Sequence, residues 1–281
     1  MATLRARIES SLSERLAPTL LLRERQPQTV TIGIAQLDAL TGGLPRGGLS
    51  EITGPVSSGR TGIMIAALAA ATQRQEACAL VDASDSFDPR SAAAAGVDLE
   101  HLLWVRCSER EPLATPDFTR NARPQRKALR RLEQVLKVTD LLLQSGGFGL
   151  VVLDMGDIPA ESTRRVPLTW WFRFRRAVEP TATVLLLVER EPCAKTCASL
   201  VVQLQRRSIC VRNAAVEKSA EITGWRVVPN IEPAVPANNV VSHAALLRGM
   251  DFDAEVIRTW TRKLVQSARS TFTLTSKSAI R

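Results

Sequence analysis

The chain has 281 residues, of which 45% are hydrophobic and 23% are charged, and 37 Lys and Arg against 28 Asp and Glu give a net charge of +9. This length and composition suffice for a buried core and exclude a chain that is disordered throughout. The basic excess favours an anionic partner, and nucleic acid before a membrane surface.

The N-terminal segment predicts an amphipathic helix over residues 1–25. Apolar residues recur every four positions from Leu4 to Leu16 with Arg and Glu between them, and Pro27 ends the pattern. Such a stripe packs on the protein's own core or docks on a neighbouring subunit, and the pattern favours neither. The charges within the segment exclude a signal peptide, and no apolar run of the chain reaches the roughly 18 residues of a membrane span.

From Leu49 onward, short apolar runs alternate with helical segments. Strands separated by helices imply right-handed crossovers, so the predicted class is α/β with a mainly parallel twisted sheet flanked by helices. The strand-like runs cover residues 49–53, 77–82, 102–105, 150–154, 183–188 and 200–205, a helix covers 61–73, and a longer amphipathic helix carries Leu129, Leu132, Leu136 and Leu143 on one face.

The segment from Leu49 to Thr61 predicts a phosphate-binding loop. A strand, a glycine-bounded loop and the start of an apolar helix follow one another, which is the context in which G-x-x-x-x-G-K-[ST] binds phosphate. Arg60 stands at the lysine position of this motif. The backbone N–H groups that cradle phosphate do not need the lysine, so we expect phosphate binding to survive. A planar guanidinium points differently from a lysine ammonium group, so we expect hydrolysis to be weak or absent. The predicted nucleotide-binding residues are Gly54, Pro55, Val56, Ser57, Ser58, Gly59, Arg60, Thr61 and Gly62.

An acidic residue, Asp154, ends the apolar run Leu-Val-Val-Leu-Asp. In phosphoryl-transfer sites such a residue lies near the Mg²⁺ that the loop Ser or Thr holds. We therefore expect Thr61 and Asp154 as metal ligands, with ATP and Mg²⁺ as the candidate cofactors. The alternative is an ordinary glycine turn followed by a strand that happens to end in Asp.

Arginines and aromatic residues alternate between positions 164 and 176. Such a mixture stacks bases and neutralises phosphates in proteins that bind single strands. Helical spacing alternatively packs Trp170 and Phe174 on the sheet and leaves the arginines in solvent, and packing is favoured for the rings. The predicted DNA-binding residues are Arg164, Arg165, Arg173 and Arg176.

The C-terminal part changes character after Gly224. Three prolines, at 229, 233 and 236, predict a linker, and residues 257–281 hold six basic residues and no acid. The predicted organisation is an N-terminal helix and linker at 1–28, a nucleotide-binding core at 29–230, and a linker with a basic appendage at 231–281.

Five cysteines, an odd number, offer no paired disulfide framework and suit a reducing cytoplasm. Cys193 and Cys197 are the only close pair, and no His lies beside them to complete a zinc site. We therefore expect reduced structural thiols.

These motifs, in this order, resemble the RecA recombinase superfamily from about Gly33 to Asn230. The likeness is carried by residues 33–38 and 42–47, the phosphate loop, and residues 80–89, 96–103 and 150–154. The resemblance implies a RecA-like P-loop core that binds ATP, self-association helped by the N-terminal helix, and a role in DNA repair.

The departures from the family lie at its catalytic positions. Ser84 stands where the family places its catalytic Glu, so the residue that orients the attacking water is missing unless Asp85 takes this role. Glu189 replaces the coupling Gln, and a carboxylate cannot donate the hydrogen bonds that the amide donates. Pro229 and Ile231 stand where the family presents lysines to a neighbour's nucleotide. We therefore assign no catalytic residue, and Ser84 and Glu189 stand at degenerate catalytic positions. Residues 189–199 are too few for the family's mobile DNA-binding loop.

This combination is similar to the RecA-like ImuA accessory proteins of the bacterial mutagenesis cassette, through residues 42–51 and 140–150. The resemblance implies an accessory in SOS-induced translesion synthesis, with single-stranded DNA, a Y-family polymerase-like protein and an error-prone polymerase as partners, in the bacterial cytoplasm at the nucleoid. The alternatives are an ATP-dependent DNA recombinase with DNA-stimulated ATPase activity and a nucleotide-binding regulator that does not contact DNA.

Overall fold

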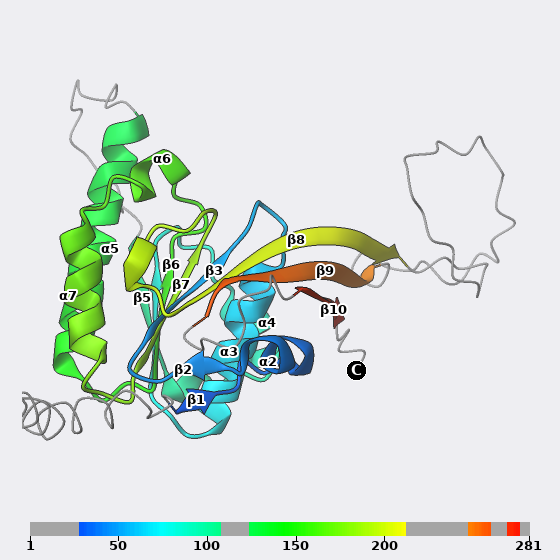
Figure 1. Ribbon diagram of the computed structural model, residues 1–281. Helices are drawn as coiled ribbons and strands as arrows, with labels where there is room; N and C mark the ends of the chain where they lie inside the picture. Colours follow the sequence, from blue (N-terminus) through cyan, green and yellow to red (C-terminus); the bar gives the residue numbers. More distant parts are fainter. Residues whose placement is uncertain (1–27, 108–123, 212–246, 260–268, 276–281) are drawn as a thin grey trace, which may run out of the picture.

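The computed structural model describes residues 28–107, 124–211, 247–259 and 269–275. Its main sheet contains β3 (Leu49–Thr53), β4 (Cys78–Asp82), β5 (Leu102–Arg106), β6 (Leu150–Asp154), β7 (Val184–Glu189), β8 (Leu200–Val211), β9 (Leu247–Arg258) and β10 (Arg269–Thr275). The order across the sheet is β10-β9-β8-β3-β7-β6-β4-β5 (Figure 1). Strands β8 to β5 pair in parallel, whereas β9 and β10 are antiparallel.

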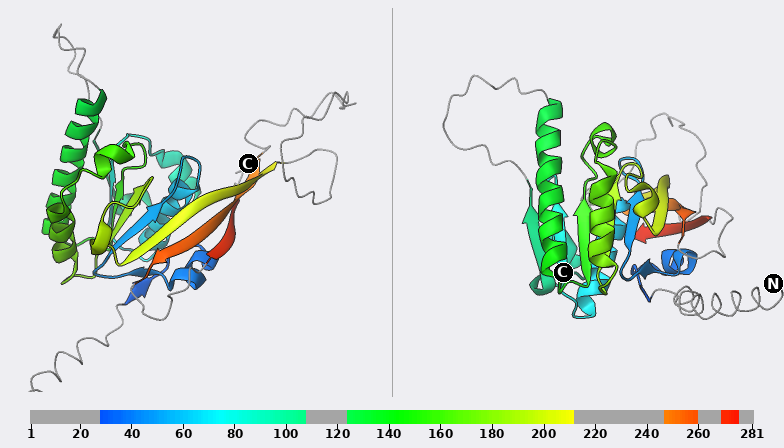
Figure 2. Two further views of the ribbon diagram at one scale, coloured as in Figure 1. Left: turned by 45° about the horizontal axis from the view of Figure 1, so that its top comes forward. Right: turned by 60° about the vertical axis from the view of Figure 1, so that its left-hand side comes forward.

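Helices cover both faces of this sheet. On one face lie α2 (Ala35–Thr41), α3 (Arg60–Gln73) and α4 (Pro89–Ala94); on the other lie α5 (Pro124–Ser145), α6 (Ala160–Thr163) and α7 (Leu168–Val178) (Figure 2). The remaining elements are the short pair β1 (Thr29–Val30) and β2 (Leu44–Pro45) and the 3-10 turns η1 (Leu99–His101) and η2 (Lys195–Cys197). This arrangement confirms the predicted α/β class with a mainly parallel sheet.

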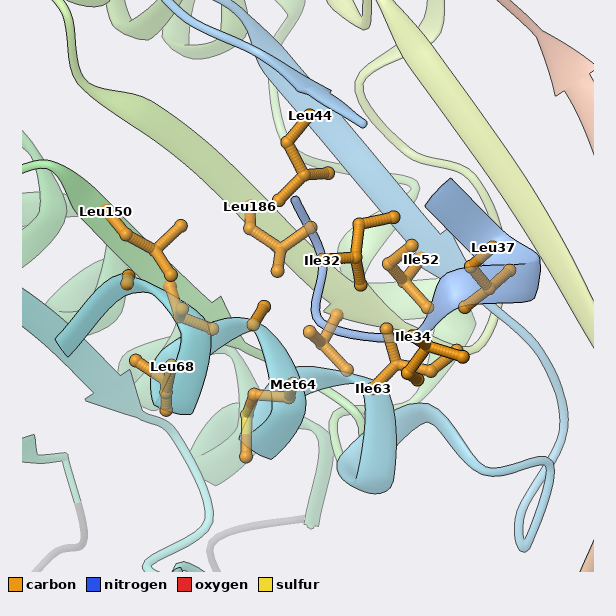
Figure 3. Packing of buried hydrophobic residues seen from close by; sticks show 14 of the residues in the cluster. Ile32, Ile34, Leu37, Leu44, Ile52, Ile63, Met64, Leu68, Leu150 and Leu186 are labelled. Carbon is orange, nitrogen blue, oxygen red and sulfur yellow. The ribbon is translucent and has the colours of Figure 1, made fainter. Parts of the chain in front are cut away.

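The core consists of two apolar layers, one on each side of the sheet. Successive residues of β6 alternate between them: Leu150 and Val152 pack under α3, whereas Val151 and Leu153 pack under α5 and α7. Figure 3 shows the first layer, in which Ile63, Met64 and Leu68 of α3 lie against residues of the sheet. Because both faces are covered, the central strands are continuous apolar runs, which is why the sequence located them.

Two helical faces differ in detail from their prediction. In α5, Leu132, Leu136 and Leu143 are buried as expected, but Leu129 is 44% exposed. In α7 the fully buried rings are those of Trp171 and Phe174, while Trp170 is only half-buried. Leu129 lies in the N-terminal part of α5, and the buried residues of this helix begin at Leu132.

Strands β9 and β10 lie in the stretch that the sequence assigned to a basic appendage. Along β9, Phe252, Ala254 and Val256 are buried and the residues between them are acidic, which is the period of two expected of a strand with one buried face. Strand β9 pairs with β8 over most of its length, so this part of the C-terminal segment extends the core sheet. The described residues do not include the predicted N-terminal helix, Pro229, Ile231 or the rest of the appendage.

Within the described part of the chain, no helix is long and apolar enough to cross a membrane. Cys78, Cys107, Cys193 and Cys197 are buried free thiols, in agreement with the expected reduced cysteines.

Candidate functional site

The predicted phosphate loop joins β3 to α3 at the carboxyl edge of the sheet. Gly59 precedes α3 in a left-handed conformation, with φ of 89°, and no side chain in the described part of the chain caps the helix. Pro55, Val56, Ser57 and Thr61 are exposed. The first N–H groups of a 14-residue helix and the positive end of its dipole are therefore available to an anion.

Close packing behind the loop explains its glycines. A Cβ at Gly54 would lie 2.5 Å from Ser58 Oγ, and one at Gly59 would lie 2.8 Å from the Phe252 ring of β9. A Cβ at Gly62 would lie 2.5 Å from Leu274 Cδ1 of β10. The sequence predicted the glycines but missed these two supports, although the alternation along β9 signals Phe252.

Arg60 turns back into the protein. Its side chain is only 9% exposed, and Nη1 is buried without a hydrogen-bond partner among the described residues. A Cβ at Gly156 would lie 3.0 Å from Arg60 Nη1 and 3.2 Å from Asp154 Oδ1, so the guanidinium and the carboxylate share one glycine surface. Burial lowers the pKa of Arg60, and the Asp154 carboxylate acts against this effect. The positive charge thus stands behind the loop, beside Asp154.

Asp154 lies at the end of β6, directly opposite Asp82 of β4 in the sheet register. Its Oδ1 accepts a hydrogen bond of 3.0 Å from the Gly156 N–H. Burial raises the pKa of Asp154 to about 6; the Gly156 bond and Arg60 lower it, and Asp82 raises it further. Arg60 supplies a positive charge next to this carboxylate; Thr61 and Asp154 remain the predicted magnesium ligands, and magnesium has no step in the function proposed below.

Of the catalytic positions, Ser84 carries no carboxylate, the carboxylate of Asp85 is held by an arginine, and Glu189 is buried at the end of β7. Ser84 Oγ is buried without a hydrogen-bond partner among the described residues, and the Ser84 N–H donates to Asp82 Oδ1 at 3.1 Å. Asp85, the possible substitute for the missing Glu, accepts two hydrogen bonds of 2.5 and 2.6 Å from Arg106. A carboxylate held in this way is a poor base for an attacking water.

The four predicted DNA-binding arginines differ in their pairing. Arg173 donates to both oxygens of Asp140 of α5, at 2.6 and 2.5 Å, and Arg164 pairs with Glu191. Arg165 and Arg176 are exposed and have no acidic partner in the described residues. The structure therefore leaves Arg165 and Arg176 as the unpaired candidates for phosphate contacts.

The aromatic residues of α7 pack in the core instead of forming an open stacking surface. The Trp171 and Phe174 rings meet edge to face with centroids 5.9 Å apart, and both residues are 0% exposed. Phe172 is the exposed ring, at 45%. Packing, the favoured alternative for the rings, is what the structure shows.

Residues 19–112, which include the phosphate loop and Ser84, match the model of the RecA N-terminal domain. This part of the chain is therefore similar in sequence to that domain. The RecA proteins of Brucella canis, Brucella suis and Brucella abortus are each 36% identical over 129 residues, which cover 45% of the chain. The match spans only 30% of the length of each of these relatives. The RecA-like region thus carries the predicted nucleotide site.

Proposed function

We propose that this chain is a RecA-like nucleotide-binding protein of DNA repair whose ATP hydrolysis is weak or absent. The observation that supports the proposal is an uncapped helix N-terminus behind a glycine loop, next to catalytic positions that hold Ser84 and a paired Asp85. The loop binds phosphate through backbone groups, so the changed side chains reduce turnover more than binding.

The binding step uses the loop and the start of α3. Backbone N–H groups hold the phosphates of ATP, and the buried Arg60 adds positive charge from behind the loop. The step that follows in a hydrolase needs a base to orient water and a cation among the terminal phosphates. Ser84 and the withdrawn Arg60 supply neither, so ATP binding leads to little product.

The accessory role in SOS-induced translesion synthesis is part of the same proposal. Exposed Arg165 and Arg176, together with the net charge of +9, support contact with single-stranded DNA. A Y-family polymerase-like protein, an error-prone polymerase and self-association are proposed as partners on the resemblance to the ImuA group. The N-terminal helix expected to support self-association lies outside the described residues.

The test measures binding of a fluorescent ATP analogue and DNA-stimulated phosphate release by the full chain. We expect saturable binding with turnover far below that of a recombinase. Turnover equal to that of a recombinase would show that the alternative, an ATP-dependent recombinase, is right. Absence of binding by the folded protein would exclude a nucleotide function.

A further inference from the structure

A second polar cluster lies on the side of the sheet away from α3, and the nucleotide site does not use it. Glu51 of β3, Glu189 at the end of β7 and Cys193 of the following loop bring two carboxylates and a thiol within 4.8 Å of one another. We call these three residues the buried carboxylate cluster. Their exposed fractions are 0%, 0% and 3%.

The position of this cluster follows from strand alternation. Leu49 and Leu187 pack in the apolar layer under α7. Glu51 and Glu189, each two residues further along its strand, point to the same face. The parallel register of β3 and β7 pairs Glu51 with Leu187 and Thr53 with Glu189, so the two glutamates are diagonal neighbours on this face, and their carboxylates approach within 4.8 Å.

The hydrogen bonds of the cluster are incomplete. Glu51 Oε1 accepts from the N–H groups of Cys193 and Ala194, at 2.9 and 2.6 Å. Glu51 Oε2 and both oxygens of Glu189 are buried and accept no hydrogen bond of good geometry from the described residues, and the groups nearest to Glu189 are the Glu51 carboxyl group and the thiol and N–H group of Cys193. Buried carboxylates are normally paired with a cation or with donors, so these three oxygens point to a ligand.

We propose that Glu51, Glu189 and Cys193 bind one divalent transition-metal ion of the zinc class. Each of the three residues offers one ligand atom, a carboxylate oxygen of Glu51 or Glu189 or Cys193 Sγ, and the second oxygen of Glu189 could complete the four donors that zinc prefers. Sulfur disfavours magnesium and calcium, which take oxygen ligands. Zinc bonds oxygen at about 2.0 to 2.2 Å and sulfur at about 2.3 Å, so atoms this close need only small shifts to share an ion.

The surroundings of the cluster suit a metal site. The two N–H groups that donate to Glu51 Oε1 fix the position of this carboxylate, as outer-shell donors do in metal proteins. Burial raises the pKa of Glu189 and of Cys193, and the neighbouring carboxylate of Glu51 acts in the same direction. Binding would form the metal–sulfur and metal–oxygen bonds, and the thiol proton would go to solvent.

A bound ion would link the buried carboxylate cluster to the predicted phosphate loop. The Gly54 N–H, at the start of the phosphate loop, donates to the carbonyls of Glu189 and Arg190, each at 3.2 Å. A metal that fixes Glu189 and the loop with Cys193 therefore also fixes the support of the phosphate loop. Local opening of the loop between β7 and β8 gives the ion its path to the cluster.

The test uses full-length protein purified without a metal-affinity step. After dialysis against Zn²⁺ or Co²⁺ and removal of free metal, we expect one ion per chain and, with Co²⁺, a thiolate-to-cobalt charge-transfer absorption band. Cys193→Ser removes the band, whereas Cys197→Ser, at a buried cysteine outside the cluster, keeps it. Glu189→Gln weakens zinc binding at least about tenfold.

Two results would overturn the proposal. One is a folded wild-type chain that binds no metal in stoichiometric amount; the cluster then holds a proton between Glu51 and Glu189, and Glu189→Gln raises the melting temperature with and without chelator. The other is a cobalt band that survives Cys193→Ser, which would place the ion elsewhere. Neither readout involves ATP, so the outcome is independent of the proposed nucleotide function.

Discussion

The predicted phosphate loop and the buried carboxylate cluster both lie near the carboxyl ends of β3 and β7, but they are built from different parts of the chain. The predicted phosphate loop is a continuous segment whose candidate binding groups are backbone N–H groups at the start of α3. The cluster consists of side chains, and Cys193 is 142 residues from Glu51. A site made of backbone keeps its geometry when Lys is replaced by Arg, whereas a site made of side chains depends on every one of its members.

The largest expected effect comes from crowding the loop. Gly59→Ala places a Cβ 2.8 Å from the Phe252 ring at a φ of 89°, and we expect about 2 to 4 kcal/mol less free energy of unfolding together with loss of ATP binding. Urea unfolding and fluorescent ATP titration measure the two effects. Leu141→Ala, at a residue of α5 that is 67% exposed and lies outside the loop, should change neither.

A double-mutant cycle separates the two causes of the Gly59 effect. Phe252→Ala removes the crowded ring but leaves the left-handed backbone, so the combined variant should lose less stability than the sum of the single variants. Strict additivity would show that β9 does not support the loop.

The second prediction concerns ATP hydrolysis, which two substitutions near the loop should restore. Ser84→Glu with Arg60→Lys returns a candidate base and a compact cation to the site, and we expect DNA-stimulated phosphate release to rise at least about tenfold. The double variant must still bind ATP. If it binds ATP without faster release, these two positions do not limit turnover.

The third effect compares paired and unpaired arginines outside both regions. Arg173→Ala leaves Asp140, 8% exposed, without its bidentate partner, and we expect a loss of about 1 kcal/mol because Arg173 itself is half-exposed. Arg176→Ala should leave stability unchanged and lower the salt dependence of DNA binding by about one phosphate contact. An unchanged salt slope for Arg165→Ala and Arg176→Ala would show that this surface does not bind DNA.

The smallest effect concerns a helix cap that belongs to neither region. Asp88 accepts hydrogen bonds from the Ser91 hydroxyl and from the N–H groups of Arg90 and Ser91, which lower its pKa. Asp88→Ala should lower Tm by no more than about 4 °C. Because the folded-state pKa lies below the unfolded value of about 3.9, this stabilisation is complete above that pH and lost as the pH falls further. Asp88→Asn should keep the cap and lack this acid dependence in thermal melts.

Local patterns located most of the central sheet. The strands at 49–53 and 150–154 have the predicted bounds, because strands buried on both faces are continuous apolar runs. Strands β9 and β10 were missed because a basic composition suggested a tail, although the alternation around Phe252 was present in the sequence. Leu129 and Trp171 show the limit of helical periodicity, since a neighbouring element decides where a buried face begins.

By itself the sequence determined the α/β class, the glycine-bounded turn between β3 and α3 that we predict to bind phosphate, and the acidic end of β6, because each depends on residues that are neighbours in the chain. Only the tertiary structure decided that Arg60 turns toward Asp154, that Asp140 pairs with Arg173, and that Glu51, Glu189 and Cys193 meet. The physical reason is that side-chain sites form where the register of distant strands and the packing of helices bring charges into one buried volume, and local sequence does not encode that register.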